Sequence, residues 1–245
     1  MTEFSEFYYG IPFFTRYWLT ATVVISILAK FGFFNPFNLI LLWTPFYSEF
    51  QIWRPLTALF YFPPSFPFLV NCYFLYSYSE RLETGMFAGK PADYFTMLAF
   101  NWLVCVVIGF LINMPLLMIP MVISVLYVWC QLNKDVIVTF WFGTRFRAMY
   151  LPWVLFAFNL IVSGGGIAEF IGILVGHLAF FLLFKYPQEF GGPTLLSPPA
   201  IVRKWFPNSR TTVTGFGGPA PARSPAGAPA PGRHNWGAGY TLGGN

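Results

Sequence analysis

Six stretches of apolar residues, separated by polar or proline-rich segments, set the pattern of this chain. A helix needs about 20 apolar residues to cross a bilayer, and several of these stretches approach that length. We therefore predict an all-α membrane protein whose six spanning helices lie near Tyr17–Phe34, Phe66–Tyr78, Tyr94–Ile112, Leu116–Leu132, Ala148–Val162 and Ile167–Phe184. Five or seven spans are the alternatives.

Two segments between these stretches are apolar but do not fit a regular span. Asn35–Pro64 is interrupted by five prolines, which predicts a long loop partly sunk in the far leaflet. Within it, Trp53 and Arg54 pair an aromatic ring with a cation, which fits either an interfacial anchor or a more specific role. The second segment, Val136–Phe142, predicts an interfacial helix on the near side.

The composition agrees with a polytopic membrane protein. Hydrophobic residues make up 56% of the chain and charged residues 9%, against roughly 25% charged in soluble domains. In the six-span arrangement only Lys30 and Arg54 of the 14 basic residues fall on the far side. The positive-inside rule then places both termini in the cytosol. The net charge of +5 reflects this topology and an affinity for anionic membrane lipids, and we do not expect nucleic acid as a partner.

The fifth stretch is short for a membrane span. About 15 apolar residues reach only about 22 Å, because an α-helix rises 1.5 Å per residue. The hydrocarbon core of a bilayer is about 30 Å thick, so we expect locally thinned lipid.

Beyond Tyr186 the composition changes. Residues 187–245 are rich in glycine and proline and contain one acidic residue, Glu189, which predicts a disordered cytosolic tail after a membrane domain of residues 1–186. The basic and aromatic segment Ala200–Phe206 is a candidate exception at the membrane surface. The tail ends in a motif that fits an extended strand lying on a partner, with anchors and glycines at Trp236, Gly237, Gly239, Tyr240, Leu242 and Gly243.

The last apolar stretch contains a histidine, His177, directly after two glycines four residues apart, Gly172 and Gly176. Small residues at this spacing favour close helix packing. A histidine here would be a general base only beside a nucleophile, but the chain has no Gly-x-Ser-Gly, and Ser124 lacks glycine neighbours. We therefore expect no catalytic residues and a structural hydrogen bond for His177. Glu169 is either exposed at the far interface or paired with the sunken loop.

Metal and cofactor sites are not expected. The cysteines and histidines have no metal-ligand spacing, and no glycine-rich run carries the Gly-Lys-Ser/Thr of a phosphate loop.

Several motifs together resemble those of the Derlins, the rhomboid pseudoproteases of the endoplasmic reticulum. The resemblance covers nearly the whole chain and is carried by Tyr17–Trp18, Gln51–Pro55, Pro91–Tyr94, Leu126–Trp129, Gln131–Asn133, Phe140–Arg145, Tyr150–Trp153 and Gly176–His177. It implies a six-span rhomboid-like bundle without peptidase activity. Trp53 and Arg54 match the family's Trp-Arg motif, and Gly172 and Gly176 match its Gly-x-x-x-Gly.

The resemblance also implies a function and partners. Derlins act in endoplasmic-reticulum-associated degradation, where they help misfolded proteins reach a ubiquitin ligase and the ATPase valosin-containing protein. The segment from Trp236 to Gly243 is similar to the family's ATPase-binding box, with Ala238 where a glutamine is common. A homo-oligomer is a further expectation. Two alternatives stay open: an active intramembrane protease using Ser124 and His177, and a small-solute channel or transporter.

Overall fold

The computed structural model describes residues 2–139, 143–191 and 195–208. Its bundle consists of α2 (Phe13–Lys30), α5 (Phe66–Thr84), α6 (Pro91–Ile112), α7 (Met118–Leu132), α8 (Leu151–Ser163) and α9 (Ile167–Phe180). Each coincides with one of the six predicted stretches. Pro91–Ile112 and the continuous run Ile167–Phe190 are long and apolar enough to cross a membrane, while Met118–Leu132 and Ala148–Ile161 are shorter apolar helices. The fold class is that of a mainly helical membrane protein.

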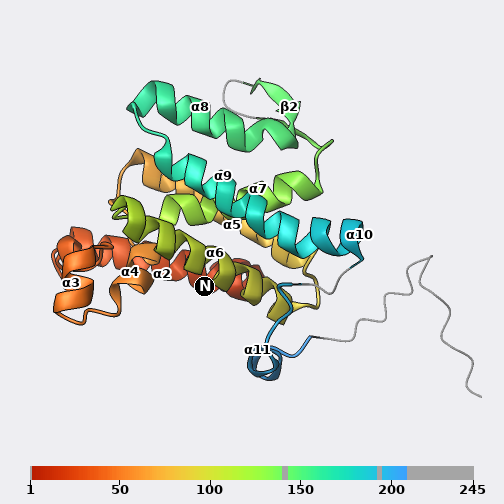
Figure 1. The fold of residues 1–245 in the computed structure, drawn as a ribbon. Coiled ribbons are helices and arrows are strands. Elements are labelled where there is room, and N and C mark those ends of the chain that lie inside the picture. The colour runs from red at the N-terminus through yellow and green to blue at the C-terminus, as the bar shows by residue number, and fades with distance from the viewer. Residues whose placement is uncertain (1, 140–142, 192–194, 209–245) are drawn as a thin grey trace, which may run out of the picture. The chain divides into compact units, whose positions relative to one another are not determined.

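Helix α7 lies at the centre of the bundle (Figure 1). It contacts α4, α5, α6, α8 and α9, and twelve of its 15 residues are buried. A helix that is apolar all round has to be surrounded by other helices or by lipid. Here its neighbours are protein, so a helix of only about 22 Å can remain within the bundle without reaching both membrane surfaces.

Helix α8 is short and lies at the edge of the bundle (Figure 1). Its 13 residues extend about 20 Å, and the preceding 3₁₀ turn η3 (Ala148–Tyr150) adds about 6 Å. It ends at Gly164, whose φ of 62° is a left-handed conformation that favours glycine. This edge helix is therefore shorter than the hydrocarbon core of an ordinary bilayer.

The predicted far-side loop, Asn35–Pro64, contains more regular structure than expected. It forms η1 (Pro36–Asn38), α3 (Trp43–Ser48) and α4 (Arg54–Phe60). Backbone hydrogen bonds join it to the turn between α6 and α7: Leu41 N donates to Pro115 O at 2.9 Å and Leu117 N to Ala58 O at 3.1 Å. Large apolar side chains still lie exposed on this segment, among them Trp43, Tyr47, Phe50 and Ile52. The segment thus packs on the bundle and keeps an apolar outer surface.

The interfacial helix predicted at Val136–Phe142 is wrong for its described residues. Strand β1 (Ile137–Thr139) pairs antiparallel with β2 (Arg145–Arg147), and residues 140–142 lie outside the described part. Val138 is buried while its two neighbours in β1 are exposed, which is the alternation of a strand with one buried face. β-branched residues at all three positions of β1 favour this conformation over a helix.

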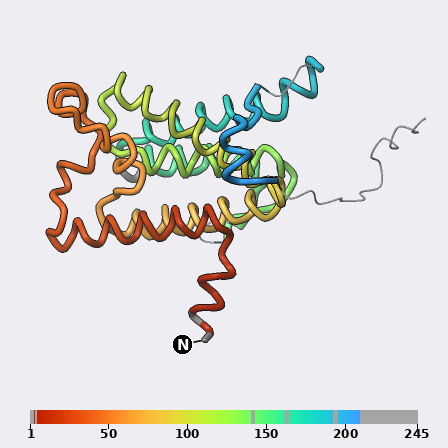
Figure 2. The backbone as a smooth tube through the Cα atoms, turned by 90° about the horizontal axis from the view of Figure 1, so that it is seen from below, coloured from red at the N-terminus to blue at the C-terminus, as the bar shows by residue number. Residues whose placement is uncertain are grey.

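The two ends of the described chain lie near the start of α2. Helix α1 (Thr2–Gly10) projects away from the bundle (Figure 2). After the bundle, the C-terminal end of α9 continues through a π-helical turn, η4 (Phe181–Lys185), into α10 (Tyr186–Phe190).

Two parts of the tail have regular structure: the residues up to Phe190, which continue α9 as part of α10, and Ala200–Trp205, in the segment that the sequence marked as a candidate exception to disorder. Helix α11 (Ala200–Trp205) packs on α6, and the Phe206 ring lies 5.0 Å from Phe14 and 5.3 Å from Phe95, centroid to centroid. Asn208 accepts a hydrogen bond from Ala92 N and donates one to Asp93, at the start of α6. Aromatic packing and capping hydrogen bonds therefore hold this basic and aromatic segment against α6 and the start of α2. Residues 209–245 lie outside the described part.

Candidate functional site

The buried side chain of Arg54 holds the far-side segment, Asn35–Pro64, together by hydrogen bonds. Its side chain is 1% exposed, and its guanidinium donates to Phe37 O at 2.8 Å, Ile40 O at 2.9 Å and Gln51 Oε1 at 2.7 Å. The neighbouring Trp53 is half exposed. Arg54 therefore acts as a buried clamp rather than as a headgroup anchor, while Trp53 is left on the surface.

Replacing Arg54 with lysine is expected to lower the free energy of unfolding by about 3 kcal/mol. A lysine ammonium is a compact donor that cannot match the planar fork of arginine, so buried carbonyls lose their partners. Thermal unfolding in detergent measures the effect. Lys30→Arg, the reverse exchange at the exposed end of α2, is the control and should unfold like the wild type. Equal stability of Arg54→Lys and the wild type would contradict the clamp.

Gly172 and Gly176 bring α9 into close contact with α7. A Cβ atom at Gly172 would lie 2.7 Å from Ile123 Cβ and 2.7 Å from Pro120 O, and one at Gly176 would lie 2.7 Å from Ser124 O. Real Cβ atoms do not approach other atoms this closely, so any larger residue would push the two helices apart. The two glycines form a helix-packing face.

Ser124 lies on this face of α7, but its hydroxyl is engaged elsewhere. The side chain is buried; Oγ donates to Met121 O at 2.7 Å and accepts from Asn101 Nδ2 at 3.1 Å. A serine nucleophile needs its proton directed to a base. Here the proton is directed to a backbone carbonyl one turn earlier.

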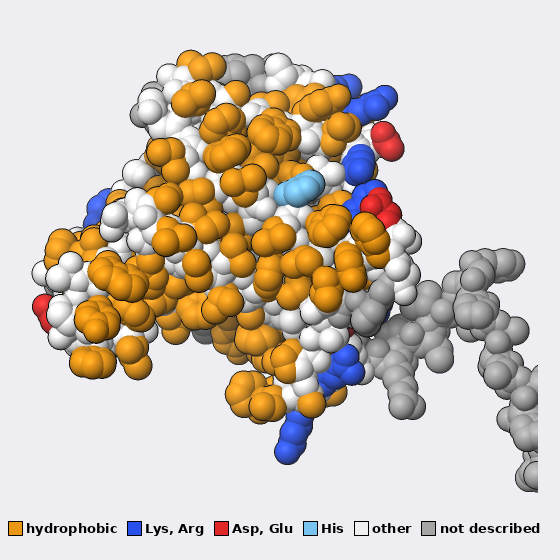
Figure 3. Space-filling view, in the orientation of Figure 1, with side chains coloured by type: hydrophobic (Ala, Val, Ile, Leu, Met, Phe, Trp, Pro, Cys, Tyr) orange, Lys and Arg blue, Asp and Glu red, His pale blue; other side chains and the backbone are white. Residues whose placement is uncertain are grey.

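His177 is hydrogen-bonded to a different residue. Its Nδ1 lies 2.8 Å from the hydroxyl of Tyr127, and the side chain is exposed on the surface of α9. Figure 3 shows a histidine surrounded by hydrophobic side chains on this face of the molecule, where Leu174 and Leu178 are also exposed. The structural hydrogen bond expected for His177 is present, and the hydrogen bonds of Ser124 and His177 go to other residues rather than to each other.

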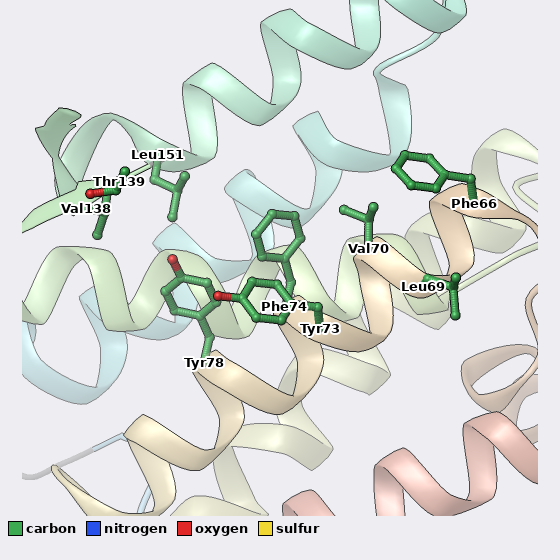
Figure 4. A pocket seen from close by; sticks show the side chains of 9 residues that line it. All are labelled: Phe66, Leu69, Val70, Tyr73, Phe74, Tyr78, Val138, Thr139 and Leu151. Atoms are coloured by element: carbon green, nitrogen blue, oxygen red, sulfur yellow. The ribbon is translucent and has the colours of Figure 1, made fainter. Parts of the chain in front are cut away.

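A groove opens between α5, the β-hairpin and the start of α8 (Figure 4). Its volume is 440 Å³, and its walls are mostly aromatic and aliphatic. Phe74 and Tyr78 project into it from α5, and Leu151 at the start of α8 faces them (Figure 4). Phe66, Leu69 and Tyr73 are each more than 60% exposed, so the groove is open at the outer surface of α5. The sequence did not reveal this groove, because its walls come from segments about 70 residues apart.

Glu169 has neither of the environments considered from the sequence. It is 5% exposed, and its Oε1 accepts a hydrogen bond from Asn159 Nδ2 on α8 at 2.7 Å. Exposure at the interface and pairing with the far-side loop are therefore both wrong. The tight turn at Gly164–Gly166 brings α8 beside the first turn of α9, which the sequence pattern could have suggested.

The tail motif predicted to bind a partner lies outside the described residues. This applies to Trp236, Gly237, Gly239, Tyr240, Leu242 and Gly243. Among the described residues there is no group of three or more His, Cys, Asp or Glu side chains that could hold a metal ion.

The fold and this groove define a mainly helical membrane protein with an open apolar groove on its surface. The Der1-like family model matches residues 11–200. The chain is 52% identical to Derlin-1 of Homo sapiens over 99% of both chains. It is also 46% identical to Derlin-1 of Caenorhabditis elegans, over 99% of this chain and 100% of that one, and 43% identical to Derlin-1 of Drosophila melanogaster, over 97% and 98%.

The chain therefore belongs to the Der1-like family, and the resemblance to the metazoan Derlins is confirmed. The chain therefore has a Derlin-family role.

Proposed function

We propose that this protein is a non-catalytic component of endoplasmic-reticulum-associated degradation that helps misfolded proteins move from the endoplasmic reticulum to the cytosol. The observation that carries the proposal is the groove between α5 and α8. It offers an apolar and aromatic surface with tyrosine hydroxyls, open on the lipid-facing side, to a polypeptide that is leaving the bilayer.

The short edge helix supports this role. With its preceding turn, α8 reaches about 26 Å, against about 30 Å of hydrocarbon. Lipid beside it would have to thin, which lowers the barrier for polar segments that cross there. The half-exposed aromatic residues of the far-side segment would sit in the same disturbed lipid.

The absence of catalysis is proposed from the hydrogen bonds of the two candidate residues. Ser124 donates to Met121 O, and the His177 imidazole is bonded to Tyr127, so no described contact activates the serine. Membership of the Derlins agrees with a rhomboid-like scaffold that has kept helix packing and lost peptidase chemistry.

The proposed arrangement in the membrane has six spans with both termini in the cytosol. The far-side segment with α3 and α4 then faces the lumen. The proposed partners are misfolded substrates, a ubiquitin ligase of the endoplasmic reticulum, further copies of this chain, and the ATPase valosin-containing protein, which the tail motif around Trp236 and Tyr240 would bind.

Turnover of a misfolded luminal reporter tests this function. In cells depleted of their own Derlin, the wild-type chain should restore degradation, and Ser124→Ala should restore it equally, because the hydroxyl takes part in no chemistry. Pulse–chase measurement of reporter half-life is the readout, with expression of each variant checked in membranes. Degradation that depends on Ser124 in a normally folded variant would favour a protease.

A further inference from the structure

A second cavity lies at the end of the bundle that holds α3 and α4. Its volume is 670 Å³, larger than that of the groove between α5 and α8. Its walls include the α6–α7 turn, the first turns of α5 and α9, and α8. Unlike the other groove, it is lined by carboxamides and a carboxylate together with apolar residues, namely Asn71, Asn113, Asn159 and Glu169.

The polar groups of this cavity include donors and acceptors, and its charged group, the carboxylate of Glu169, is an acceptor. One amide hydrogen of each of two carboxamides is used: Asn159 Nδ2 donates to Glu169, and Asn71 Nδ2 donates to Pro67 O at 2.9 Å. The side-chain carbonyls of Asn71 and Asn159 remain beside the carboxylate of Glu169. A positively charged donor complements the carboxylate of this lining, and the carboxamide oxygens can accept further hydrogen bonds from it.

The carboxylate has no cationic partner within the described residues. Neither lysine nor arginine lines the cavity, and the ion pairs of the described part join Arg147 to Asp135 and Lys185 to Glu189, all at the opposite end of the bundle. A carboxylate that is 5% exposed inside a membrane protein is costly unless it is paired. The hydrogen bonds from Asn159 and from the backbone N–H of Glu169 itself compensate only part of this cost.

We infer that this cavity binds a basic side chain, of arginine or lysine, presented by an extended polypeptide. The cavity is within the size range of ligand sites, roughly 300–1,000 Å³, and can take a long side chain together with its flanking backbone. An arginine can donate to the Glu169 carboxylate with two hydrogens and still reach a carboxamide oxygen. The inference rests on the proposed function, in which this end of the bundle meets luminal, unfolded chains.

Binding of paired peptides to the purified full-length protein in nanodiscs tests the site. One fluorescent peptide carries a single arginine in an uncharged, extended sequence, and the other carries citrulline, which has the same shape without the charge. The wild type should bind the arginine peptide at least about tenfold more tightly, equivalent to about 1.4 kcal/mol. Glu169→Gln, which keeps an acceptor for Asn159, should abolish this preference.

The matched control is Glu49→Gln, an exposed carboxylate at the same end of the bundle, which should keep the preference. The ratio of the two affinities within one variant does not depend on what fraction of the sample is folded, and a cooperative thermal unfolding transition of Glu169→Gln shows that a folded fraction is present. Equal binding of both peptides by the wild type, or an unchanged ratio in Glu169→Gln, would overturn the inference.

Reporter turnover separates this result from the broader proposal. If the wild type restores reporter degradation but does not discriminate between the peptides, the cavity inference fails and the proposed function stands. If the peptides are discriminated but degradation never depends on the protein, the proposed function fails and the cavity still binds basic side chains.

Discussion

Replacing Gly176 with valine is expected to force α9 away from α7 and to lower the free energy of unfolding by about 3 kcal/mol. The added Cβ would meet Ser124 O and Tyr127 Cβ at 2.7 Å and the Ser124 Cα at 3.1 Å. Two of these atoms belong to the backbone of α7, so no rotation of a side chain can relieve the overlap. Helix α7 contacts most of the bundle, and the displacement would therefore disturb several interfaces at once.

Thermal unfolding in detergent, followed by tryptophan fluorescence, measures this effect. Gly165→Ala is the matched control, because a Cβ there would have no atom within 4 Å and the residue has no left-handed backbone conformation. The control should unfold like the wild type. An unfolding temperature for Gly176→Val equal to that of the wild type would mean that the two helices are not held at this distance.

Deleting residues 236–245 is expected to abolish co-purification of the ATPase while leaving the membrane domain inserted. The deletion removes the aromatic and aliphatic anchors Trp236, Tyr240 and Leu242, and such residues supply most of the binding energy in small interfaces. Affinity purification in mild detergent, with immunoblotting for valosin-containing protein, gives the readout.

A deletion of equal length from the spacer, residues 219–228, is the control and should retain the ATPase. Ala238→Gln should strengthen binding, because glutamine is common at this position in the family's box. Retention of the ATPase after removal of residues 236–245 would show that the tether lies elsewhere in the chain.

The positions of the bundle helices could be predicted because apolar length is a local property of the sequence. All six stretches, such as Tyr94–Ile112 and Leu116–Leu132, coincide with helices of the structure. The close packing suggested by Gly172 and Gly176 was likewise readable from spacing alone, since residues four apart share one face of a helix.

Features that depend on distant partners could not be predicted. The β-hairpin forms only when β1 pairs with β2, which follows it after residues 140–142. The apolar segment Val136–Phe142, considered alone, does not indicate this pairing. The burial of Arg54 depends on the backbone carbonyls of Phe37 and Ile40, which lie beside its guanidinium only in the folded chain. The hydrogen bond between Tyr127 and His177 joins residues 50 positions apart.

The structure of the tail could be predicted only in part from its composition. Its glycine and proline content predicted disorder with Ala200–Phe206 as a candidate exception, and Phe206 and Asn208 have partners on the surface of the bundle. Composition describes what a segment can bury by itself, not what a neighbouring surface can offer it.

The thickness of the bilayer around the protein tests the central claim most directly, namely that this scaffold deforms the lipid beside it. Cryo-electron microscopy of the protein in nanodiscs can compare the hydrocarbon layer beside α8 with that at the edge of the disc. The layer beside α8 should be thinner by about 4 Å or more, the difference between about 26 Å of helix and about 30 Å of lipid. A layer of uniform depth up to the surface of α8 would contradict the claim.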